Sequence, residues 1–88
     1  VGGATASAIG TKLLKISNNQ QTIVVTHSPQ VAAKGNHHIL IKKSIIENET
    51  ITETYELNHQ EKIEEIARMI SDDNISDEAR NAALKLLT

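Results

Sequence analysis

The sequence contains no cysteine, tryptophan or phenylalanine, and Tyr55 is its only aromatic residue. The absence of cysteine excludes a disulfide scaffold, thiolate zinc sites and cysteine nucleophiles. No apolar run approaches the roughly 20 residues that cross a bilayer, and no signal peptide opens the sequence. We therefore expect a cytoplasmic protein with no membrane partner.

The aliphatic residues that are present suffice for one small core. The 88 residues allow a single small domain or a piece of a larger one, and 39% of them are hydrophobic. A chain of this length buries only about 60–65% of the surface exposed by its unfolded form, so we expect a thin margin of stability. The sequence opens with Val1-Gly2-Gly3 and its only methionine is Met69, which favours a piece of a longer protein.

Charge is divided unevenly along the chain. Residues 1–45 hold five lysines and no acid, whereas residues 46–88 hold all eleven acids against four basic residues, a net charge of −7. A basic half can face the phosphates of a nucleotide or a nucleic acid. Alternatively, the two halves attract each other or the lysines only solvate a surface. Five dispersed lysines form no patch by themselves, which favours this second interpretation.

The first third of the chain has the pattern of a helix followed by a buried strand. Residues 4–17 place four apolar side chains at helical spacing: Ala6, Ile9, Leu13 and Ile16. Thr22–Thr26 is a β-branched run that is apolar on both faces at its centre, as is typical of a strand inside a parallel sheet. A helix leading into such a strand predicts a βαβ unit whose first strand lies before Val1.

The middle of the chain predicts a short helix and then a β-hairpin. Ser28 can cap a helix over residues 29–33, because Pro29 suits the first helical position, and Gly35 can end it. Residues 37–46 and 50–57 have the pattern of two strands. The polar turn at residues 47–49 between them indicates an antiparallel hairpin.

The last third predicts two helices. Asn58 and Glu61 have the spacing of a capping box, and the first helix carries an apolar stripe and a favourable Glu64–Arg68 pair. Residues 71–74 break this helix, and Ser76 caps the next one. The stripe of the first helix is Ile63, Ile66, Ala67 and Ile70, and the final helix carries Ala79, Ala83, Leu86 and Leu87.

His27 is the residue that points most directly to chemistry. It follows the predicted strand directly and precedes the capped helix, and ligands of open α/β sheets bind at the carboxyl ends of strands. A histidine there can donate a hydrogen bond to phosphate or transfer a proton, or it can simply satisfy backbone groups. A Ser–His nucleophile pair with Ser28 is disfavoured, because neighbours in an extended strand point to opposite faces.

Two other candidate sites are weaker. The four histidines lack the spacing of a metal site: His37 and His38 are adjacent and diverge in a strand, so we expect no metal. Gly2 and Gly3 open a helix and could receive an anion on free N–H groups. The phosphate-binding pattern G-x-x-x-x-G-K-[ST] is absent, so these residues cannot hold a triphosphate alone.

Several stretches carry a resemblance to a known family. The start Gly3-Ala4-Thr5-Ala6 and the run Val24-Val25-Thr26-His27-Ser28-Pro29-Gln30-Val31-Ala32-Ala33 resemble the end of the RecN nucleotide-binding domain. RecN proteins are bacterial ATPases of DNA double-strand-break repair, of the SMC-like, ABC-type class. The resemblance continues through residues 35–38, 51–54, 64–70 and 77–80 and the closing Leu86-Leu87, and so covers essentially the whole chain.

The resemblance implies a fold and a role for named residues. The fold would be α/β, residues 1–88 forming the C-terminal part of one ABC-type (P-loop NTPase) head: helix, buried strand, short helix, β-hairpin and two C-terminal helices. His27 would be the switch histidine that contacts the γ-phosphate. Residues 1–3, with Gly2 and Gly3, would be the rest of the D-loop, which often carries Ser where Gly2 stands. Gln30 would at most position its neighbours.

The same resemblance implies partners and a cofactor. The whole protein would bind ATP and Mg²⁺, pair with a second ATPase head, act on DNA and lie in the bacterial cytoplasm at the nucleoid. The Walker A loop, the signature motif and the Walker B strand would precede Val1. The 88 residues alone are then expected to bind no cofactor and to hydrolyse no ATP.

Alternatives of other classes remain open at this point. The chain could be a free-standing, non-catalytic α/β interaction module that uses its acidic helices for docking. Direct DNA binding by the basic half is weaker, because the lysines are few and there is no aromatic platform. If the strand Thr22–Thr26 lacks its neighbours, its unpaired edge predicts dimerisation or strand exchange.

Overall fold

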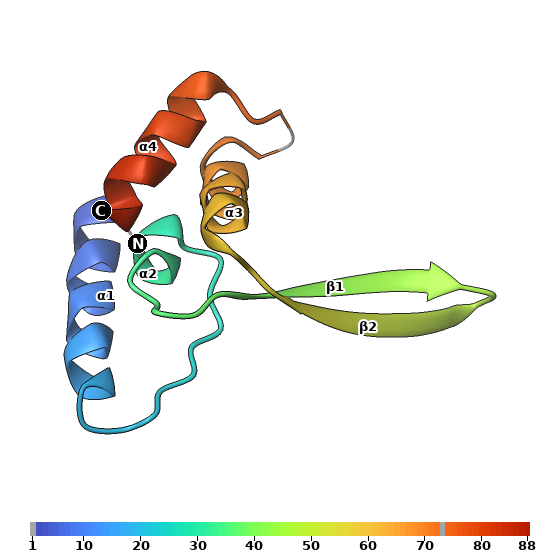
Figure 1. The fold of residues 1–88 in the computed structure, drawn as a ribbon, viewed down its shortest axis with the longest axis horizontal. Coiled ribbons are helices and arrows are strands. Elements are labelled where there is room, and N and C mark those ends of the chain that lie inside the picture. The colour runs from blue at the N-terminus through green and yellow to red at the C-terminus, as the bar shows by residue number, and fades with distance from the viewer. Residues whose placement is uncertain (1, 73) are drawn as a thin grey trace.

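The computed structural model describes residues 2–72 and 74–88, which form helices and one β-hairpin (Figure 1). In chain order the elements are α1 (Gly3–Ser17), α2 (Pro29–Ala32), β1 (Ile39–Ile46), β2 (Glu49–Glu56), α3 (His59–Ser71) and α4 (Asp77–Leu87). The predicted α/β class is confirmed. Two predicted features include positions outside the described residues: Val1 of the D-loop remnant and Asp73 of the break between the last two helices.

Helix α1 confirms the first predicted helix, but only part of its apolar stripe is covered. Ala6 and Gly10 are buried, whereas Ile9 and Ile16 are 44% and 46% exposed. Gly10 is the point of close approach to α2. A Cβ at this position would lie 3.2 Å from the carbonyl oxygen of Gln30 and 3.4 Å from the Cα of Val31. The missing side chain therefore lets the two helix backbones touch.

The predicted strand at residues 22–26 is wrong for this structure. The segment carries no strand, and Ile23 and Val25 are 85% and 88% exposed. A strand exists only when a neighbouring strand accepts and donates its backbone hydrogen bonds. The only pairing among the described residues is β1 with β2, so this segment stays extended, unpaired and apolar.

Helix α2 confirms the predicted cap at Ser28. Its hydroxyl oxygen accepts a hydrogen bond from the Val31 N–H at 3.4 Å, and Pro29 occupies the first helical position. The helix ends one residue before the predicted Ala33, and the predicted role of Gly35 as its terminator is wrong. The helix closes at Ala32 with Ala33 as a right-handed C-cap, and Gly35 does not adopt a left-handed backbone. The helix can end without that device because the Lys34 and Gly35 N–H groups donate to the carbonyl oxygens of Val31 and Ala32, both at 3.1 Å.

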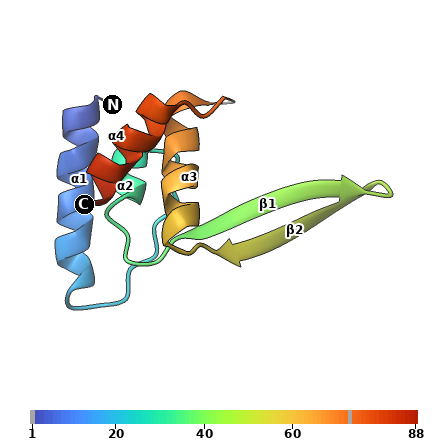
Figure 2. The same cartoon turned by 45° about the horizontal axis from the view of Figure 1, so that its top comes forward.

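The hairpin confirms the predicted antiparallel pair with slightly shifted bounds. Ile46 pairs with Glu49, so a two-residue turn joins the strands, and both turn residues have positive φ: 51° at Glu47 and 65° at Asn48. This is the geometry of a tight turn whose twist matches the strands. The hairpin extends away from the helices (Figures 1 and 2). The four isoleucines of β1 are 54–77% exposed.

The core lies between α3 and α4. The capping box is confirmed: the Glu61 N–H donates to Asn58 Oδ1, and the Asn58 N–H donates to Glu61 Oε1, both at 2.9 Å. Ile70 departs from the predicted stripe, because it is 39% exposed. The small alanines let the two helices approach closely around the fully buried Ile66. The buried cluster is Ile63, Ile66, Ala67, Ala79 and Ala83, with Leu86 and Leu87 partly buried against it.

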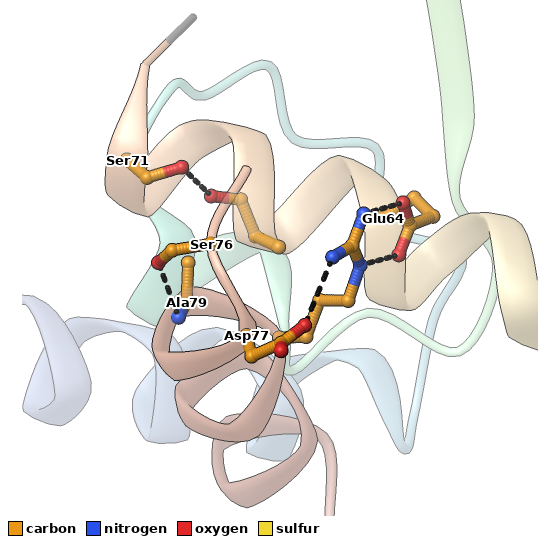
Figure 3. Close-up of polar contacts among 7 residues, drawn as sticks. Glu64, Ser71, Ser76, Asp77 and Ala79 are labelled. Atoms are coloured by element: carbon orange, nitrogen blue, oxygen red, sulfur yellow. Dashed lines mark hydrogen bonds and ion pairs between the residues drawn. The ribbon is translucent and has the colours of Figure 1, made fainter. Parts of the chain in front are cut away.

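An ion pair between the helices replaces the predicted Glu64–Arg68 pair, which is wrong. The Arg80 guanidinium donates to both carboxylate oxygens of Glu64, at 2.8 and 3.1 Å, and Arg80 also reaches Asp77 (Figure 3). These hydrogen bonds hold the pKa of Glu64 below its usual range. Arg68 instead donates to Glu65, one turn back on its own helix, at 2.6 and 2.7 Å. The Arg80 guanidinium binds both oxygens of the Glu64 carboxylate across the two helices. The i,i+4 spacing rule describes pairs within one helix and cannot predict such a contact.

Candidate functional site

His27 lies in the irregular segment between α1 and α2, and its side chain is exposed. Because the predicted strand before it does not form, His27 is not at the end of a strand here. It does lie directly before the cap of α2, as the sequence predicts. The imidazole is therefore free to contact a ligand, and its backbone is fixed on one side by the start of a helix.

A chain of hydrogen bonds holds the residues on both sides of His27. The Ser28 N–H donates to Thr26 Oγ1 at 3.0 Å, across His27. The Ser28 hydroxyl accepts from the Val31 N–H and donates to Gln30 Oε1 at 3.2 Å. One hydroxyl thus serves the helix cap and the Gln30 side chain together. The backbone position of His27 depends on this arrangement.

His27 opens onto a cleft of about 380 Å³ between α1 and the start of α2. Helix α1 contributes apolar side chains, and the following segment contributes the imidazole, a hydroxyl and an amide. The lining residues are Ala6, Ile9, His27, Ser28, Pro29, Gln30 and Val31. None of them is a lysine or an arginine, so this cleft can position a ligand and exchange a proton with it but cannot neutralise several phosphate charges.

Of the two glycines at the start of α1, only Gly3 lies close to this network. Gly2 is the N-cap, with an extended backbone and no side-chain cap. A Cβ added to Gly3 would lie 3.3 Å from Gln30 Nε2, whereas one added to Gly2 would meet nothing within 4 Å. The structure therefore brings Gly3, but not Gly2, against the residues that hold His27. The Gly3–Gln30 contact spans 27 positions, and no local pattern in one sequence could have revealed it.

The other histidines have structural surroundings. His38 is only 9% exposed, and its Nε2–H donates to the Gly35 carbonyl at 3.2 Å. Burial is the main cause that lowers the pKa of His38, with a smaller contribution from Lys62, and so favours the neutral ring. The His37 side chain is exposed, and its Nδ1 lies 3.3 Å from Glu56 Oε1. Adjacent histidines thus point into different environments.

Residues 2–72 and 74–88 contain neither a cluster of metal ligands nor a helix suited to cross a membrane. No three of their His, Asp and Glu side chains come together as metal ligands would. None of the helices described combines the length and the apolar character that crossing a membrane requires.

Curated proteins similar to this chain share one name. The chain is 45% identical over 87 residues to a protein of Rickettsia felis named DNA repair protein RecN. It is 46% identical to the protein of that name from Xylella fastidiosa strain 9a5c and 38% identical to the one from Deinococcus radiodurans, again over 87 residues. Each match covers 99% of this chain. The chain belongs to the RecN family.

The match covers a small share of each RecN protein. The chain spans 16% of the length of the Rickettsia felis and Xylella fastidiosa proteins and 15% of the Deinococcus radiodurans protein, and corresponds to the C-terminal part of RecN. No family model matches the chain. The resemblance carried by the Thr26-His27-Ser28-Pro29 run is confirmed by these full-chain matches.

Proposed function

We propose that this chain supplies the switch histidine and the D-loop side of an ATP site in a protein of DNA double-strand-break repair and recombination. The observation that carries the proposal is His27 itself. Its exposed imidazole opens onto a cleft beside the start of α1, and the bonds from Ser28 to Thr26 and Gln30 hold its backbone. The relatives named for DNA repair supply the biological context.

The residues present fit part of such a nucleotide site. Bound ATP with Mg²⁺ supplies the phosphoryl group and the positive charge that offsets the developing negative charge. An imidazole N–H at His27 can donate a hydrogen bond to a terminal phosphate oxygen and orient a water molecule for in-line attack. The first N–H groups of α1, which receive no side-chain cap from Gly2, can donate hydrogen bonds to an anionic group.

The same residues explain why this chain should not hydrolyse ATP alone. No lysine or arginine lines the cleft, and no phosphate-binding glycine loop with its lysine occurs in the sequence. Phosphoryl transfer relies on positioning and on charge stabilisation, which one histidine cannot provide. The missing groups would come from the rest of the ATPase domain, to which residues 1–88 would belong, and from a second ATPase head of the same protein.

The unpaired apolar segment also supports a larger domain. Ile23 and Val25, at 85% and 88% exposed, would be covered if neighbouring strands of the whole protein paired with this segment. We place the assembled protein in the bacterial cytoplasm, at the nucleoid, with DNA as its partner. Direct DNA binding by the lysines of this chain is disfavoured, because Lys42 and Lys43 point to opposite faces of β1.

The interaction-module alternative rests on a different observation. Helices α3 and α4 enclose their own buried cluster, as a free-standing domain must. The same chain leaves Ile23 and Val25 uncovered, which a free-standing module would avoid. The exposed segment therefore favours the ATPase proposal.

The proposal is tested by DNA-stimulated ATP hydrolysis in the full-length protein. We expect His27→Ala to lower kcat tenfold or more, equivalent to about 1.4 kcal/mol of transition-state stabilisation, while ATP still binds. The matched control is His59→Ala, an exposed histidine at the first position of α3, which should leave kcat unchanged. Unchanged turnover of the His27 variant would contradict the proposal and favour the interaction module.

A further inference from the structure

We infer that the Gln30 side chain is a positioning residue that couples the start of α1 to His27, an inference whose catalytic meaning rests on the proposed function. Two contacts carry it. Gln30 Oε1 accepts the Ser28 hydroxyl hydrogen bond at 3.2 Å. On the other side of the same amide, Nε2 lies where a Cβ on Gly3 would approach it to 3.3 Å.

The first contact ties Gln30 to the position of His27. The Ser28 oxygen that donates to Gln30 is also the oxygen that caps α2 by accepting from Val31, and the Ser28 N–H bonds back to Thr26. A change in the orientation of the Gln30 amide therefore changes where the Ser28 hydroxyl points. Since Ser28 follows His27 directly, the imidazole should respond.

The second contact makes the coupling sensitive to the start of α1. Gly3 has no side chain, so the Gln30 amide can lie against its backbone. A side chain that fills the space at Gly3 requires Nε2 to shift by a few tenths of an ångström, and because the amide is planar Oε1 moves with it. Gly2, one residue earlier, has no neighbour within 4 Å of its ideal Cβ and lacks this contact. The two adjacent glycines are therefore predicted to behave differently.

The coupling is tested first by NMR of the His27 ring in this 88-residue chain, assigned by the signal that disappears in His27→Ala. Gly3→Ala and Gln30→Ala should each shift the His27 ring signals, and the double variant should shift them no further than Gln30→Ala alone. Gly2→Ala and Gln20→Ala, both at exposed positions, should leave the signals unchanged. Far-UV circular dichroism checks that the variants keep their helices.

The chemistry of the amide is tested by conservative variants. Gln30→Glu retains an acceptor for the Ser28 hydroxyl and should keep the His27 signals near their original positions, whereas Gln30→Met retains the bulk without the acceptor and should shift them. In the full-length protein, Gln30→Ala should lower kcat for ATP about threefold to tenfold with KM within twofold of the original value. Gln30→Glu should restore most of the loss.

Each outcome decides one of the two proposals. If Gly3→Ala leaves the His27 signals unchanged, or if its shift adds to that of Gln30→Ala, the coupling is overturned whatever happens to turnover. If the signals couple as expected but His27→Ala hydrolyses ATP normally, the proposed function is overturned and the catalytic role of Gln30 with it. Coupled signals together with a kcat loss in both variants support both.

Discussion

Ile66 is the large side chain on which the stability of this chain should depend most. It is fully buried, and its neighbours in the cluster include Ala67, Ala79 and Ala83. Replacing a buried isoleucine by alanine costs about 2–5 kcal/mol, with the larger values where the surroundings cannot fill the cavity. The three neighbouring alanines cannot rearrange to fill the cavity, because an alanine side chain has no alternative rotamers. We therefore expect Ile66→Ala to lower the free energy of unfolding by about 3–4 kcal/mol.

This loss is large compared with the total stability expected. At about 0.05–0.15 kcal/mol per residue, the 88-residue chain should have an unfolding free energy of about 4–13 kcal/mol. Urea unfolding followed by circular dichroism at 222 nm measures the change. Fluorescence would not report on this core, because there is no tryptophan and Tyr55 is 42% exposed on the hairpin. With an m value of about 1 kcal/mol/M, the urea midpoint should fall by about 3–4 M.

A second variant keeps the test usable if Ile66→Ala does not fold. Ile66→Val removes one methylene and should cost about 0.5–1.5 kcal/mol. The matched control is Ile70→Ala, on the same helix but 39% exposed, which should cost less than about 1 kcal/mol because no closed cavity forms. Equal losses for Ile66→Ala and Ile70→Ala would refute the assignment of the core to the α3–α4 contact.

Three further predictions concern other parts of the fold. Gly10→Val should lower the thermal midpoint by several degrees, because its side chain meets the backbone of α2, whereas Val at the exposed Ala8 of the same helix should change it little. Burial lowers the pKa of His38, so the unfolded chain binds a proton at this residue more readily than the folded chain does. The free energy of unfolding should therefore be highest above about pH 6.5 and fall as the pH drops through that value. Equal urea midpoints at pH 7.5 and 5.5 would contradict this. Finally, light scattering should detect self-association through the uncovered segment, and Ile23→Lys with Val25→Lys should reduce it; a clean monomer at all concentrations would oppose the idea.

Local sequence rules predicted most of the elements but not the contacts between them. The caps at Ser28, Asn58 and Ser76 form as their residue types and spacing indicated. These motifs are closed within four residues, so sequence alone contains everything they need. The partner of Glu64 was predicted wrongly because Arg80 reaches it across a helix crossing whose geometry no local pattern encodes.

The segment before His27 shows what the sequence cannot predict about strands. Its β-branched residues correctly indicate a strong preference for extended backbone, and residues 21–28 carry no helix. They cannot indicate whether a pairing partner exists among the same 88 residues. Ile23 and Val25 are exposed because, among the described residues, β1 and β2 pair only with each other and no strand pairs with this segment. A β-branched segment forms a strand only when a neighbouring strand pairs with it, and the sequence of the segment does not show whether that neighbour is present.

This difference bears on how His27 could be controlled. On its carboxyl side the residue is fixed by the Ser28 cap and, through Gln30, by contact with Gly3. On its amino side lies the extended segment that ends at Thr26, which pairs with no strand among the described residues and accepts a hydrogen bond from the Ser28 N–H. If neighbouring strands of a full-length RecN protein pair with that segment, both sides of His27 become fixed at once. We therefore expect the His27 ring to be more mobile in the 88-residue chain than in the full-length protein. Relaxation measurements on the His27 ring should then give a smaller order parameter in the 88-residue chain than in the full-length protein, and equal values in the two would contradict this view.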